Sequence, residues 1–172
     1  MAEKLAEYTT LKVGGLAEIV HAKSEKELIE ALLSAGDKEV LILGGGSNLL
    51  IGDEPFTGLV TVAAGEDWDS FVNFTIEKGL ANLESLSGIP GTVGAAPIQN
   101  IGAYGHDVSE VIARVRTFDR KAKEVKTIMA SELDFGYRTS KFKREPNRFV
   151  ILDVTFHLRR GENSLPIKYE EL

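Results

Sequence analysis

The 172-residue sequence predicts an α+β protein with a βαβ-like N-terminal portion and a strand-rich C-terminal portion. Two patterns carry this prediction: a strand–helix–strand succession in the first 43 residues, and alternating apolar residues after residue 110. A third observation is glycine, which makes up 17 of the residues and is clustered. The length suits one domain or two small ones, and an apolar content of 43% argues against global disorder.

The first portion contains a clear helix start. Ser24 and Glu27 have capping-box spacing, in which the serine oxygen accepts from the Glu27 N–H and the Glu27 carboxylate reaches back. Apolar residues follow at helical spacing, and Gly36 is a natural end for this helix. Ala17–Ala22 and Glu39–Leu43 are predicted to be the flanking strands.

The second portion begins with a strand and a helix. Leu59–Ala64 is predicted to be a strand, and Asp67 is predicted to cap a helix from Trp68 to Lys78 that Gly79 ends. The helix is expected to bury one face, formed by Trp68, Phe71, Val72, Thr75 and Ile76.

Strands dominate the remainder. Val111–Asp119 and Glu124–Met129 are predicted to form a hairpin. Phe149–Leu158 alternates between apolar and polar residues, which predicts a half-buried strand with Asp153 and Thr155 on its polar face.

Composition excludes several classes of protein. The chain has no cysteine, so it has no disulfide framework, cysteine nucleophile or thiolate metal site. A net charge of −6 argues against a protein that coats nucleic acid. The longest apolar runs are far too short for a membrane span, and no signal-like core is present, so we expect a cytoplasmic protein without membrane contact. The three histidines are isolated from one another, so no metal site is expected.

A glycine-rich stretch follows the strand predicted at 39–43 and consists of Gly44, Gly45, Gly46, Ser47 and Asn48. Successive glycines can present consecutive N–H groups to an anion, or they can simply make a tight turn. The stretch is not a Walker A loop, because no Gly-Lys-Ser/Thr follows it, and Leu49 occupies the place of the third Rossmann glycine.

The second glycine-rich segment, Gly88–Gly105, has almost no charge and is therefore expected to pack rather than to act as a linker. Gly88, Gly91 and Gly94 lie three residues apart, with Pro90 among them. Prolines stiffen such a loop and glycines permit a close approach to a ligand, although a buried structural crossover would have the same composition.

A third segment, Phe135–Phe142, places Arg138 and Lys141 around a Ser/Thr pair. Arg138 is either an ordinary solvated side chain or a guanidinium aimed at a carboxylate or enolate.

Together these segments resemble the UDP-N-acetylenolpyruvoylglucosamine reductase (MurB) family of peptidoglycan synthesis. The resemblance runs nearly end to end and is most specific in the Gly88–Gly105 block and in the Gly-Tyr-Arg-x-Ser motif. The matching segments are Thr10–Gly15, Leu41–Leu50, Gly65–Trp68, Leu86–Gly105, Phe135–Ser140 and Phe149–Leu158.

The resemblance implies the FAD-binding fold of the PCMH/vanillyl-alcohol-oxidase type, with FAD between two α+β subdomains at residues 1–60 and 61–172. The Gly44–Asn48 loop and the 88–94 turn would hold the pyrophosphate and ribityl chain, and 99–104 would lie near the isoalloxazine. The expected FAD-binding residues are Gly44, Gly45, Gly46, Ser47, Asn48, Gly88, Ile89, Pro90, Gly91, Gly94, Ala95, Gln99, Asn100, Gly102, Ala103 and Tyr104.

In the family, NADPH reduces FAD, and the flavin then delivers hydride to the enolpyruvyl group. The resemblance gives Arg138 the role of stabilising the enolate-like intermediate, with Tyr137 supporting it. Family members also have a third domain with a serine proton donor and a catalytic glutamate, for which these 172 residues show no counterpart. We therefore expect an FAD-binding portion that needs that domain to bind the UDP-sugar and complete the reaction. Alternatives are a non-catalytic or engineered FAD-binding scaffold, or a domain for another nucleotide such as ADP-ribose.

Overall fold

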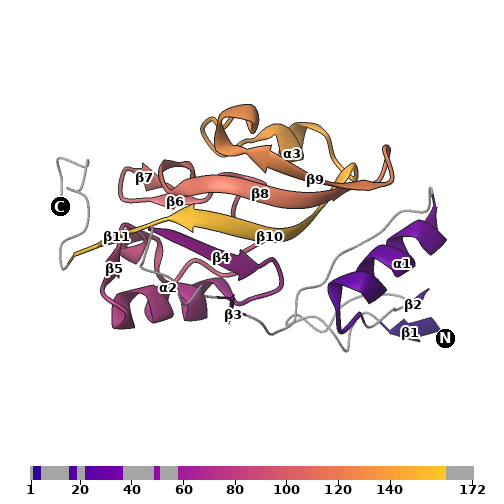
Figure 1. Ribbon diagram of the computed structural model, residues 1–172, viewed down its shortest axis with the longest axis horizontal. Coiled ribbons are helices and arrows are strands. Elements are labelled where there is room, and N and C mark those ends of the chain that lie inside the picture. Colours follow the sequence, from indigo (N-terminus) through magenta and orange to yellow (C-terminus); the bar gives the residue numbers. More distant parts are fainter. Residues whose placement is uncertain (1, 5–15, 19–21, 37–48, 51–57, 162–172) are drawn as a thin grey trace. The chain divides into compact units, whose positions relative to one another are not determined.

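The computed structural model describes residues 2–4, 16–18, 22–36, 49–50 and 58–161. The chain divides into two compact units, Met1–Leu43 and Gly44–Leu172, and each is described by itself (Figure 1). The predicted subdomain boundary between residues 60 and 61 remains a prediction.

The first unit has an antiparallel strand pair and one helix. β1 (Ala2–Lys4) pairs with β2 (Leu16–Glu18), which overlaps the strand predicted at Ala17–Ala22 at residues 17 and 18. Before α1 (Glu25–Ala35), the Ser24 hydroxyl oxygen accepts from the Glu27 N–H at 3.3 Å. The Glu27 carboxylate reaches back to the Lys23 N–H at 2.8 Å, and Gly36 follows the helix at a φ of +56°, so both ends are as predicted. The strand expected at 39–43 lies outside the described residues.

The second unit is organised around a five-stranded antiparallel sheet. Its strands, in spatial order, are β3 (Leu49–Leu50), β4 (Leu59–Ala63), β10 (Phe149–His157), β8 (Ile112–Asp119) and β9 (Glu124–Met129). The predicted β8–β9 hairpin is confirmed, with Asp119 opposite Glu124 at its turn. β10 occupies the centre and pairs with β4 on one side and with β8 on the other.

The prediction that Thr155 lies on a solvent-facing polar face of β10 is wrong, because Thr155 is buried, whereas His157 on the same face is exposed. The Thr155 hydroxyl lies 2.9 Å from that of Thr61, and the Arg114 side chain donates to it at 3.4 Å. Asp153, two residues away, pairs with Arg116 at 2.6 Å. A central strand has neighbours on both sides, so their side chains cover even its polar face.

Helix α2 (Trp68–Glu77) covers the apolar face of the sheet. The Asp67 carboxylate caps it by accepting from the Ser70 N–H at 2.8 Å, and the Phe71 and Phe156 rings pack with centroids 5.0 Å apart. The helix buries Trp68, Phe71, Val72 and Thr75 as predicted. The prediction is wrong for Ile76, which is 47% exposed, because it lies about 80° around the helix from Trp68 at 100° per residue.

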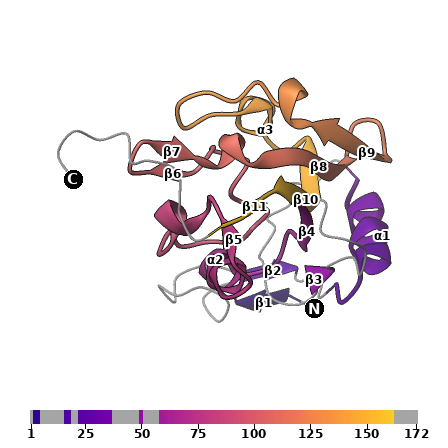
Figure 2. The same cartoon turned by 60° about the vertical axis from the view of Figure 1, so that its left-hand side comes forward.

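Short elements complete the second unit. They are β5 (Leu80–Ala81) paired with β11 (Arg159–Arg160), β6 (Gly102–Ala103) paired with β7 (His106–Asp107), the 3₁₀ turns Glu84–Leu86, Val108–Glu110 and Ala130–Glu132, and α3 (Lys141–Arg144). In both views α2 lies beside β4 and β5, whereas α3 lies beyond β8 (Figures 1 and 2). No described helix is long and apolar enough to cross a lipid bilayer.

Candidate cofactor-binding site

The start of α2 holds both ends of the predicted ligand-binding loop. The Trp68 N–H donates to the Gly91 carbonyl at 3.0 Å, and the Trp68 indole N–H donates to the Leu86 carbonyl at 2.8 Å. Trp68 is itself buried in the core, so the loop from 86 to 91 is anchored to a rigid helix end.

Asp69, the next residue of the helix, holds the base of the same loop at Ser87 and Gly88. Its Oδ1 accepts from the Ser87 hydroxyl at 3.0 Å and from the Gly88 N–H at 2.7 Å. Gly88 has a φ of +74°, a conformation that glycine adopts without strain. A single carboxylate oxygen therefore orders two successive loop residues.

The loop continues as an added strand-like segment against the end of β4. The N–H groups of Val93 and Gly94 donate to the Glu66 and Ala64 carbonyls at 2.9 and 2.8 Å. A Cβ on Gly94 would lie 2.6 Å from the Ala64 Cβ, so only glycine fits at this buried position. Gly94, expected to bind the cofactor, thus has a packing role in the structure that is independent of any ligand.

The tip of the loop is open. Gly91 is exposed and has a φ of +132°, and a Cβ added to it would meet no atom within 4 Å. Pro90 beside it is exposed as well. Within the part of the chain that the structure describes, the N–H groups of Ile89, Gly91 and Thr92 have no hydrogen-bond partner. Three backbone donors within the four residues 89–92 can therefore bind an anion or another acceptor.

Asn100 joins the rest of the Gly88–Gly105 segment to two other parts of the unit. It is 2% exposed and has a φ of +49°. Its Nδ2 donates to the Gly136 carbonyl at 3.1 Å, and its Oδ1 accepts from the Ser109 N–H at 3.1 Å. The amide of this expected FAD-binding residue is thus engaged within the protein. Ala95 and Gln99, on the turns before it, are exposed.

The Gly-Tyr-Arg-x-Ser motif forms a tight turn beside this segment. Gly136 and Thr139 exchange backbone hydrogen bonds of 3.0 and 3.2 Å. The Arg138 guanidinium donates to the Gly102 carbonyl, and the buried Ser140 hydroxyl donates to the Ile98 carbonyl at 2.6 Å. The structure therefore brings together two segments that short-range sequence patterns single out separately.

Aromatic side chains on this surface are exposed. Tyr137 is 92% exposed and its ring centroid lies 5.8 Å from the Arg138 guanidinium. Tyr104, next to the half-buried Gly102 and Ala103, is 52% exposed. Arg138 thus contacts the expected flavin-facing segment at Gly102, and the side chains of Tyr137 and Tyr104 are open to a ligand.

Sequence reasoning missed the residues that build the loop. Trp68 was predicted to be a core residue, and no function was assigned to Asp69. The Gly65–Trp68 motif was the available signal, and the structure explains it, because residues 64–69 run alongside 86–94. The Gly44–Asn48 loop lies outside the described residues.

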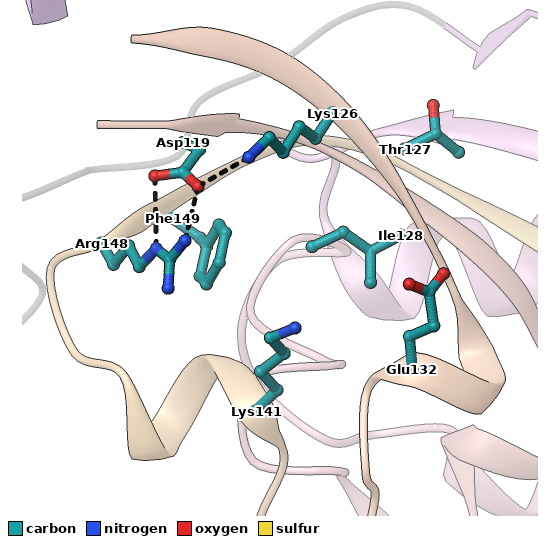
Figure 3. Close-up of a pocket in the computed structure, with 8 residues that line it drawn as sticks. All are labelled: Asp119, Lys126, Thr127, Ile128, Glu132, Lys141, Arg148 and Phe149. Carbon is teal, nitrogen blue, oxygen red and sulfur yellow. Dashed lines mark hydrogen bonds and ion pairs between the residues drawn. The ribbon is translucent and has the colours of Figure 1, made fainter. Parts of the chain in front are cut away.

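A separate cavity of about 310 Å³ lies at the β8–β9 turn (Figure 3). It is lined by Asp119, Lys126, Thr127, Ile128, Glu132, Lys141, Arg148 and Phe149. Asp119 is fully buried, and its carboxylate pairs with Arg148 at 2.9 Å and Lys126 at 3.3 Å. The hydrogen bond from Arg148, together with N–H groups of the turn, holds the pKa of Asp119 well below its usual range despite burial.

These charges satisfy one another and tie the hairpin turn to the start of β10, which is a structural arrangement. Among the described residues, no group of three or more His, Asp and Glu side chains is arranged to hold a metal ion.

Comparison with known proteins shows what this part of the chain is similar to. The family model described as "FAD binding domain" matches residues 53–127, which include α2 and the whole 86–105 segment. The chain is 48% identical to the UDP-N-acetylenolpyruvoylglucosamine reductase of Cutibacterium acnes and 44% identical to that of Thermobifida fusca, in each case over 98% of its length. The crystal structure of the reductase from Thermus caldophilus superposes with a TM-score of 0.72 at 28% identity, covering 94% of this chain and 62% of that one.

The resemblance to the UDP-N-acetylenolpyruvoylglucosamine reductases is confirmed. The predicted α+β fold of the FAD-binding type is confirmed with it. The chain spans about half the length of the curated reductases it matches, 51% in one case and 53% in another. FAD is the cofactor that the family match supports.

Proposed function

We propose that this chain is the FAD-binding portion of a UDP-N-acetylenolpyruvoylglucosamine reductase, with FAD-binding subdomains at residues 1–60 and 61–172. The observation that carries the proposal is the 86–92 loop, whose base is fixed by Trp68 and Asp69 while its tip offers unpaired N–H groups. Backbone donors suit a pyrophosphate even in an acidic protein, because they supply a local positive field without cationic side chains.

Residues in two parts of the 86–105 segment are proposed to contact the flavin cofactor. Ile89, Gly91 and Thr92 would donate to the phosphate or ribityl oxygens, together with the Gly44–Asn48 loop. Gln99, Ala103 and Tyr104 would line the isoalloxazine ring. Bound FAD would supply the hydride chemistry, and this chain would supply orientation and electrostatics.

Arg138 is the proposed catalytic residue. Its guanidinium is exposed and is oriented by the Gly102 carbonyl, which leaves other N–H groups for a substrate. In this position it would stabilise negative charge that develops on an enolate-like intermediate, and Tyr137 would support it through ring contact.

The complete reaction is also part of the proposal. NADPH as hydride source, the UDP-sugar as substrate and a role in peptidoglycan synthesis come from the family resemblance, and a cytoplasmic location comes from the absence of a signal-like apolar core in the sequence. Substrate binding and proton donation would come from a third domain, with its serine and glutamate, as in the family.

A titration with FAD tests the proposal. The purified chain should bind one FAD per chain, with a shifted flavin absorbance spectrum and altered flavin fluorescence. ADP-ribose serves as the competitor. Tighter binding of ADP-ribose than of FAD would favour the alternative nucleotide domain, and a chain that takes up no FAD would overturn the proposal.

A second assay separates a reductase portion from a non-catalytic scaffold. The FAD-loaded chain would be mixed with NADPH and the enolpyruvyl substrate, with and without a separately supplied C-terminal half of a relative. Substrate-dependent NADPH oxidation in the presence of that half supports the reductase. FAD binding without any such oxidation supports the scaffold.

A further inference from the structure

We infer that Asp69 is a positioning residue for the cofactor: it fixes the Ser87–Gly88 base of the loop so that the tip is ready to bind. The inference rests on the proposed function, and it assigns to Asp69 no contact with the flavin itself.

The contacts of Asp69 divide between loop and helix. Oδ1 receives both loop donors, the Ser87 hydroxyl and the Gly88 N–H, whereas Oδ2 lies 3.5 Å from the Asn73 Nδ2. Hydrogen bonds to a carboxylate are stronger than those between neutral groups. The half-buried carboxylate also lies in the first turn of α2, where the helix dipole favours a negative charge.

These contacts prevent the Gly88 N–H from donating to a cofactor. Its N–H is already bonded to Asp69, so it has no donor left for a cofactor. The unpaired donors begin one residue later, at Ile89, and continue at Gly91 and Thr92. The N–H of the base at Gly88 is thus bonded within the protein, whereas the N–H groups of the tip are left to a ligand.

Ordering the loop in advance should strengthen binding. A loop that is already held in its binding conformation loses less conformational entropy when the ligand arrives. Without Asp69, Ser87 and Gly88 would have no partner at the helix end, and Trp68 alone would hold the loop at Leu86 and Gly91. Binding would then require the loop to be ordered first, which slows association.

Asp67 provides a matched control because it lies two residues earlier and has a different task. Its carboxylate accepts from the Ser70 N–H inside its own helix, and that hydrogen bond lowers its pKa. Asp67→Ala removes a carboxylate at the same helix end and weakens the helix. It leaves the carboxylate contacts to Ser87 and Gly88 in place.

The experiment measures FAD affinity and association rate for the full chain and for Asp69→Ala, Asp69→Asn, Ser87→Ala, Asp69→Ala/Ser87→Ala and Asp67→Ala. Asp69→Ala should weaken FAD binding at least tenfold and slow association. Asp69→Asn keeps an acceptor oxygen and should recover most of that loss. Ser87→Ala should cost about threefold alone and nothing further in the double variant, since one contact is shared.

The outcomes separate the two claims. A wild-type chain that binds no FAD overturns the proposed function together with this inference. A wild-type chain that binds FAD while Asp69→Ala binds it equally well and equally fast overturns the inference alone. Equal losses in Asp69→Ala and Asp67→Ala, or additive losses with Ser87→Ala, would show that Asp69 acts through general helix stability, and they would also overturn it.

Discussion

Two polar regions of the second unit, the 86–92 loop and the Asp119 cluster, differ in how many of their hydrogen-bonding groups are paired within the protein. In the 86–92 loop, Asp69 accepts from Ser87 and Gly88, and Trp68 donates to the carbonyls of Leu86 and Gly91, whereas the N–H groups of Ile89, Gly91 and Thr92 remain open. In the Asp119 cluster, the carboxylate takes Arg148, Lys126 and two turn N–H groups, so its acceptors are filled by the protein. The first region is arranged to receive a ligand and the second to hold a hairpin.

The two regions differ because one contains a buried carboxylate and the other contains exposed backbone N–H groups. A buried carboxylate must be compensated within the fold, because an unpaired charge there is expensive. An exposed backbone N–H is satisfied by water until a ligand replaces it, so it can be left open at little cost. Changes in the cluster should therefore affect stability, and changes in the loop should affect binding.

Removal of Arg148 should give the largest effect on stability. Arg148→Met leaves the fully buried Asp119 without its principal partner and should lower the free energy of unfolding by about 3 kcal/mol. Chemical denaturation measures this loss, with Lys121→Met as an exposed control. The FAD affinity of the folded variant should be unchanged. A large loss of affinity would contradict the claim that the Asp119 cluster affects stability and not binding.

Acid should weaken the same cluster. The pKa of Asp119 in the folded protein is held below its ordinary value of 3.8. The ionised carboxylate therefore contributes its full stabilisation above that pH, and this stabilisation is lost as the pH falls toward the pKa of the folded protein. Stability should therefore fall below about pH 4, which denaturation across a pH series measures. In Asp119→Asn the slope should flatten, and an unchanged slope would assign the acid sensitivity to other carboxyls.

Gly94→Ala should lower both the stability of the fold and the affinity for FAD, since this residue lies where the loop meets the end of β4. Its Cβ would come within 2.6 Å of the Ala64 Cβ, and overpacking of this kind costs about 2 kcal/mol. Thermal unfolding and FAD titration are the measurements, and FAD binding should weaken as the loop shifts. Normal stability would show that the loop yields easily and is not held as the structure indicates.

Arg138→Ala should have the smallest effect on the fold. The side chain is exposed and its one described hydrogen bond is to the Gly102 carbonyl, so unfolding should change by less than about 1 kcal/mol. FAD affinity should be kept, while substrate-dependent NADPH oxidation with a supplied C-terminal half should be lost. Equal oxidation rates with and without the substitution would remove Arg138 from the catalytic role.

Local sequence signals predicted the elements but not their partners. The caps at Ser24 and Asp67 and the β8–β9 hairpin follow from short-range patterns. The burial of Thr155 and the bonds from Asp69 to Ser87 and Gly88 depend on segments far apart in sequence. Periodicity cannot reveal such pairings, and for this reason Asp69 was missed although its neighbours were recognised.

Amide hydrogen exchange tests the central claim most directly, because it reports both regions in one protein. On addition of FAD, exchange should slow at Ile89, Gly91 and Thr92, whose N–H groups are unpaired in the structure, and stay unchanged at Lys121 and Ala122, whose N–H groups bond to Asp119. Protection at the Asp119 turn without protection at the loop tip, or no protection at either, would contradict the account.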